Sequence, residues 1–94
     1  MYYKLRLTNY FDVWGNEKDG YEVNDARIER DNIWTNELDD KTLLNILKNS
    51  GFLRKNIRIN QLNFEWVGPE CCEISVQRNG YPLGRIDIID WKED

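Results

Sequence analysis

The sequence predicts an α+β fold in which an antiparallel sheet of about five strands carries one helix on one face, in the order β-β-α-β-β-β. Segments near both ends of the chain alternate apolar and polar residues, as half-buried strands do. The first of them, YYKLRLTNYF at residues 2–11, alternates Tyr3, Leu5 and Leu7 with polar residues. A segment near the middle has the spacing of an amphipathic helix, and Gly-containing turn signals separate the strands. Because the chain has 94 residues and no linker or repeat, we expect a single domain over residues 1–94.

A second strand is predicted within residues 20–34, where apolar residues again alternate with polar ones. The Asp19-Gly20 pair before it is a strong hairpin signal. Pairing across that turn would set Glu17 against Glu22, and like charges that face each other destabilise a sheet. A longer loop between the two strands is therefore equally consistent with the sequence.

The clearest element is a helix over DDKTLLNILKNSGF, from about Asp40 to Ser50. An aspartate at its start can cap the first backbone N–H groups. Gly51 is placed to end the helix in a left-handed conformation, which would let Phe52 pack back on Leu47. Its apolar face is formed by Leu43, Leu44, Ile46 and Leu47.

The segment IRINQLNFEWVGPE predicts the third strand, which ends at a Gly-Pro pair. Its apolar residues change parity near Asn60, so the strand either contains a bulge or changes the face that it buries. Phe64 and Trp66 share the parity of Leu62, and we expect both aromatic side chains in the core.

The segment CCEISVQRNGYPLGRIDIIDW predicts the final hairpin, with a two-residue turn at Asn79-Gly80. Continuing that register would place an arginine opposite Ile74. One extra residue at Gly84 would instead place Ile86 opposite Ile74 and restore an apolar face.

The charge of the chain is −4 overall but unevenly distributed. Residues 12–40 contain ten acids and three bases, a net of −7, whereas residues 41–85 contain seven bases and three acids, a net of +4. This polarity favours a protein partner or self-association over a nucleic-acid footprint. The sequence contains no apolar run that predicts a transmembrane span or signal peptide, and adjacent Cys71 and Cys72 are poorly placed to form a disulfide, so we expect a cytoplasmic protein with reduced thiols.

Catalysis is not expected, and the sequence predicts no catalytic residue, cofactor or metal ion. The chain has no histidine, the commonest general base and metal ligand. The adjacent cysteines lack the spacing of a zinc or redox motif. The two glycines of FDVWGNEKDGYEVN fit neither a calcium-binding loop nor a phosphate-binding loop.

Direct nucleic-acid binding is not expected either, because the acidic isoelectric point of about 4.8 opposes attraction to phosphates. The alternative is that the protein mimics nucleic acid and does not bind it. In that case the acidic surface of residues 12–40 would imitate nucleic acid and inhibit a host or defence enzyme.

Four residues are the candidates for contact with a protein partner: Trp14, Asp19, Tyr21 and Trp34. The first three lie in FDVWGNEKDGYEVN, which is either a connection between strands or a recognition loop. The chain has four tryptophans, and one helix over one sheet face cannot cover them all. We therefore expect at least one exposed tryptophan at a protein–protein surface, including that of a homodimer formed at an open sheet edge.

The stretch DVWGNEKDGYEVN, together with GFLRKNIRIN and the closing PLGRIDI, resembles a group of short proteins found in phages and mobile elements of Gram-positive bacteria. The resemblance implies a bacterial cytoplasm and an accessory role, such as modulating a host or element protein, and it supplies no activity or functional residue. The expectation is thus a small, non-enzymatic protein that binds another protein, with the acidic inhibitor as the alternative.

Overall fold

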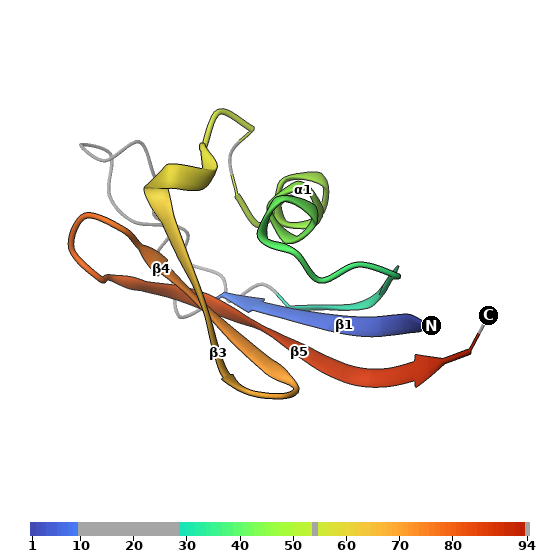
Figure 1. The fold of residues 1–94 in the computed structure, drawn as a ribbon. Coiled ribbons are helices and arrows are strands. Elements are labelled where there is room, and N and C mark those ends of the chain that lie inside the picture. Colours follow the sequence, from blue (N-terminus) through green and yellow to red (C-terminus); the bar gives the residue numbers. More distant parts are fainter. Residues whose placement is uncertain (10–28, 54, 94) are drawn as a thin grey trace.

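The computed structural model describes residues 1–9, 29–53 and 55–93. The described part is an antiparallel five-stranded sheet with one α-helix over one face, which confirms the predicted fold class (Figure 1). The elements in chain order are β1 (Tyr2–Asn9), β2 (Glu29–Thr35), α1 (Asp40–Asn49), a 3₁₀ turn (Ile59–Gln61), β3 (Leu62–Gly68), β4 (Cys71–Val76) and β5 (Pro82–Lys92). The strand order across the sheet is β2-β1-β5-β4-β3, so β2 and β3 form its two edges.

The core lies between α1 and the sheet. In the register of the central strands, Leu5 faces Ile88 and Leu7 faces Ile86, which places these four apolar side chains on the same face. All four are buried. The helix covers them with three buried leucines, Leu43, Leu44 and Leu47. The predicted alternation along β1 is therefore confirmed, and the polar residues between the leucines lie on the opposite face of the sheet.

Both predicted ends of α1 are confirmed. Asp39 caps the first turn, because its carboxylate accepts a hydrogen bond from the Thr42 backbone N–H at 3.2 Å and another from the Thr42 hydroxyl at 2.6 Å. The side-chain hydrogen bond from Thr42 lowers the pKa of Asp39 from its ordinary value. At the other end, Gly51 has φ +81° and Phe52 donates its backbone N–H to the Leu47 carbonyl at 2.9 Å. This is the hydrogen bond that defines a Schellman cap, and it places Phe52 in the core.

The third strand begins later than predicted. The change of parity near Asn60 comes from a 3₁₀ turn before β3, not from a bulge or a change of buried face within a strand. Gln61 stabilises this turn with two hydrogen bonds. Its side-chain oxygen accepts one from the Arg58 backbone N–H at 2.7 Å, and its backbone N–H donates the other to the Arg58 carbonyl at 2.9 Å. The prediction of a buried Trp66 is also wrong. Leu62 is buried and Phe64 is half-buried, but Trp66 is 37% exposed, because β3 is an edge strand whose far half has little cover.

The final hairpin has a different turn and register from the prediction. Its loop contains four residues, since Val76 accepts a hydrogen bond from the Gly80 N–H at 2.7 Å and donates its own N–H to the Tyr81 carbonyl at 2.8 Å. Ser75 then faces Pro82 and Ile74 faces Gly84. The extra residue is therefore at position 83, immediately before the predicted position. The bulge restores the apolar face as expected, but with Cys72 and not Ile74 opposite Ile86.

Candidate functional site

Of the four residues predicted to contact a partner, Trp34 is described by the structure, whereas Trp14, Asp19 and Tyr21 lie outside the described residues. Trp34 is in edge strand β2 and faces Lys4 of β1. The next pair in this register, Leu5 with Ile33, faces the core, so Trp34 is on the side of the sheet opposite α1. Its side chain is 37% exposed, as the prediction of an exposed tryptophan required.

Trp34 belongs to an aromatic–lysine cluster formed with Tyr2 and Lys92. The Nζ atom of Lys92 lies 4.4 Å from the centre of the Trp34 ring and 6.0 Å from that of Tyr2. Both distances are within the range of cation–π attraction. The cluster combines three strands, because Tyr2 pairs with Lys92 between β1 and β5 and the Lys92 side chain reaches across β1 to β2.

The cluster lies where β1 begins and β5 ends, at one end of the sheet (Figure 1). Tyr2 is 36% exposed and Trp34 is 37% exposed, so each ring keeps surface that a partner can cover. Trp91, which is 57% exposed, lies at the same end but faces the other side of the sheet, since it pairs with Tyr3. Rigid aromatic rings with a fixed cation can anchor a protein partner at a small cost in conformational entropy.

The rest of this open sheet face has charges of both signs close together. The Arg85 Nε atom lies 2.9 Å from the Asp87 carboxylate. Arg85 also faces Glu73 across the β4–β5 pair, and Glu73 in turn faces Glu65 of β3. Carboxylates on this face are thus interleaved with arginine, in contrast to the uniform negative charge of a nucleic-acid backbone.

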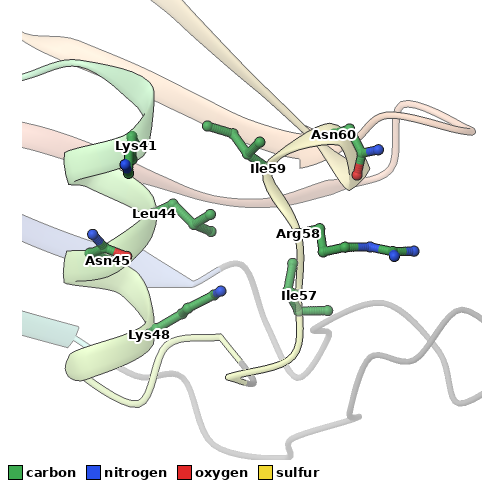
Figure 2. A pocket seen from close by; sticks show the side chains of 8 residues that line it. All are labelled: Lys41, Leu44, Asn45, Lys48, Ile57, Arg58, Ile59 and Asn60. Carbon is green, nitrogen blue, oxygen red and sulfur yellow. The ribbon is translucent and has the colours of Figure 1, made fainter.

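A groove is present on the other side of the molecule, between α1 and the segment that leads into β3 (Figure 2). Its volume is about 520 Å³, which is within the usual range for ligand sites. Leu44 and Ile57 are buried there, whereas Ile59 is 42% exposed. The groove is lined by Lys41, Leu44, Asn45, Lys48, Ile57, Arg58, Ile59 and Asn60.

The two cysteines are free, with Cys72 buried on the helix side of the sheet and Cys71 partly buried. One thiol is thus in the core, and its neighbour lies nearer the surface. Burial raises the pKa of Cys72 to about 12, and burial together with a hydrogen bond to Asp87 raises the pKa of Cys71. Because the thiolate is the reactive form, both thiols are poor nucleophiles at neutral pH.

Two further observations on the described residues concern metal binding and membrane spans. Across residues 1–9, 29–53 and 55–93, no group of three or more acidic or cysteine side chains is arranged to hold a metal ion. No helix in the same ranges is both long and apolar enough to cross a membrane.

Sequence reasoning identified Trp34 but not its neighbours Tyr2 and Lys92. Tyr2 and Lys92 lie in the first and last strands, which pair with each other. The sequence did not predict that pairing, so it did not predict the contact. The groove was missed because Ile57 and Ile59 were assigned to a strand, although the excess of basic residues around it was apparent.

Comparisons of the chain with protein-family models, with curated proteins and with solved structures found no match.

Proposed function

We propose that this protein is a small, non-enzymatic accessory protein that acts by binding another protein through the aromatic–lysine cluster. The observation that carries the proposal is the pair of partly exposed rings, Tyr2 and Trp34, held around the Lys92 ammonium group. Aromatic and cationic side chains of this kind dominate the binding energy of many protein interfaces.

The cluster can contribute substantial binding energy. A tryptophan presents on the order of 250 Å² of surface, so the 37% of Trp34 that is exposed corresponds to roughly 90 Å². At roughly 25 cal/mol per Å², covering that surface stabilises a complex by about 2 kcal/mol. This free energy corresponds to a change of about 30-fold in Kd.

The cluster also indicates what the partner should present. Lys92 is held by two ring faces and keeps donors for a carboxylate or a backbone carbonyl of the partner. A partner surface that combines an apolar patch with such an acceptor would match Trp34 and Lys92 together.

The acidic inhibitor is supported less well by the described residues. A mimic of nucleic acid needs carboxylates repeated without intervening cations, whereas Arg85 lies between Glu73 and Asp87 on the open face. Most of the acidic stretch, residues 12–40, lies outside the described residues. Binding through the aromatic–lysine cluster is therefore the function that we propose.

The cellular setting of the proposal comes from the resemblance to short proteins of phages and mobile elements. On that basis the chain acts in a bacterial cytoplasm and modulates a protein of the host or of the element. A homodimer formed through the same surface is the other protein partner that the cluster could accept.

The test is affinity purification of the tagged chain from nuclease-treated lysate of a Gram-positive host, with mass spectrometry of the bound proteins. Trp34→Ala is compared with Trp66→Ala, which removes a tryptophan of equal exposure (37%) from the opposite edge of the sheet. We expect one discrete partner that Trp34→Ala loses and Trp66→Ala retains. Equal recovery by the two variants, or no discrete partner together with a monomer by light scattering, would refute the proposal.

A further inference from the structure

The groove beside α1 has an excess of positive charge, although the protein as a whole is acidic. The chain carries a net charge of −4, yet the charged residues among those lining the groove are three cations, Lys41, Lys48 and Arg58. Asp39 and Asp40 lie at the N-terminal end of α1, outside the lining. Attraction for an anion is therefore strongest toward Lys48, in the last turn of the helix.

The base of the groove is apolar. Leu44 and Ile57 are buried, and Ile59 is 42% exposed. Figure 2 shows the Leu44 and Ile59 side chains directed toward the space between α1 and the segment of residues 57–60, with Lys48 extending toward the same space. A ligand that fits must therefore bring an apolar group as well as negative charge.

The spacing of the cations favours an extended ligand over a small anion. Lys41 and Lys48 are seven positions apart on α1, a rise of about 10.5 Å along the helix. Side chains four residues apart lie on the same face of an extended peptide, about 13 Å apart, with one more side chain between them on that face. Two carboxylates at this spacing can each pair with one of the two long lysine side chains, with an aliphatic group between them. The lining contains no aromatic side chain on which a nucleic-acid base could stack.

We propose that this groove binds a short extended segment of a partner protein in which aliphatic side chains lie between carboxylates. The aliphatic groups cover Leu44 and Ile59, and the carboxylates pair with Lys48 and Lys41. The inference depends on the proposed function only in taking the ligand to be part of a protein. The groove is separate from the aromatic–lysine cluster, which lies on the opposite face of the sheet.

The probe is a fluorescein-labelled synthetic peptide of sequence Glu-Glu-Leu-Leu-Glu-Glu, titrated with the full-length chain and followed by fluorescence anisotropy. We expect saturable binding that weakens as salt is added. Peptides with lysine in place of glutamate, or glycine in place of leucine, should bind at least about tenfold more weakly, because one reverses the charge complementarity and the other removes the apolar anchor.

Variants locate the binding. Lys48→Glu and Ile59→Ser should each weaken the binding of the acidic peptide by about tenfold in Kd. Lys55→Glu is the matched control, since Lys55 is an exposed lysine outside the lining, and its affinity should stay within about twofold. Amide chemical-shift changes should concentrate at residues 41–48 and 57–60. Trp34→Ala should bind the peptide normally, which separates this test from that of the aromatic–lysine cluster.

Several results would overturn the inference. They are no binding at millimolar protein, equal binding of the lysine peptide, and equal effects of Lys48→Glu and Lys55→Glu. Complete displacement of the peptide by inorganic phosphate, or equally tight binding of a single-stranded DNA oligomer, would make the groove a general anion site. A dimer that Lys48→Glu converts to a monomer in sedimentation velocity would assign the groove to a second copy of the chain.

Discussion

Replacement of Gly51 by alanine isolates the cost of the left-handed backbone that ends α1. Gly51 has φ +81°, and a Cβ built on it meets nothing within 4 Å, so backbone strain is the main effect of the substitution. A non-glycine residue in this conformation costs roughly 1–2 kcal/mol. Alanine also restricts the unfolded chain, which offsets roughly 0.4–1 kcal/mol of that cost. We therefore expect Gly51→Ala to lower the free energy of unfolding by about 1 kcal/mol, or the Tm by about 4–8 °C.

The assay is urea denaturation followed by circular dichroism, with Gly68→Ala as the matched control. Gly68 also has open space around a built Cβ, but its φ lies outside the left-handed region. Alanine is less costly than glycine in a strand, so Gly68→Ala should leave the protein equally or more stable. A Gly51→Ala protein as stable as Gly68→Ala would show that the left-handed turn does not carry the cost assigned to it.

Three further predictions concern the core, the helix cap and the thiols. Phe52→Ala should lower the free energy of unfolding by about 3–5 kcal/mol in the same assay, because the Phe52 side chain is fully buried; a loss below about 1 kcal/mol would contradict its place in the core. Asp39→Ala should lower the Tm at pH 7, with Asp40→Ala as the control. Because the pKa of Asp39 is lowered in the folded protein, the charged cap stabilises the fold fully at pH values above the ordinary aspartate pKa. This stabilisation is lost as the pH falls through the folded pKa, so the difference in Tm between the unsubstituted protein and Asp39→Ala should vanish in strong acid. Cys72, with its pKa raised from 9.0 to about 12, should have about a thousandfold less thiolate than an ordinary cysteine, and Cys71→Ser should react with a thiol reagent at pH 8 only on unfolding.

Local signals were sufficient to predict α1 and both of its ends. A capping aspartate, an apolar face and a glycine before Phe52 act within a few residues of one another, so no knowledge of the rest of the fold is needed. The same applies to the alternation along β1, where Leu5 and Leu7 are buried as expected.

Features set by distant contacts could not be predicted in the same way. The length of the hairpin loop depends on which residue pairs with Val76. Both the predicted and the observed loop keep an apolar face once a bulge is allowed. Trp66 has the parity of a core residue, but the place of β3 at the edge of the sheet leaves it exposed. Whether a strand lies at the edge or in the centre of a sheet is set by the strand order, which the sequence of a single strand does not encode.

The candidate sites show the same limit. Trp34 was identified by its type and by the number of tryptophans in the chain. Its contact with Lys92 requires β1 to lie between β2 and β5. The groove requires the 3₁₀ turn that places Ile59 beside α1, and that turn depends on the side chain of Gln61.

The most direct measurement is photo-crosslinking in cells with p-benzoylphenylalanine in place of Trp34, compared with the same substitution at Trp66. The two positions have equal exposure and lie at opposite edges of the sheet. If the aromatic–lysine cluster binds a protein, irradiation should give one discrete adduct of higher mass from position 34 and none from position 66. No adduct from position 34, or the same set of adducts from both positions, would contradict the proposed function.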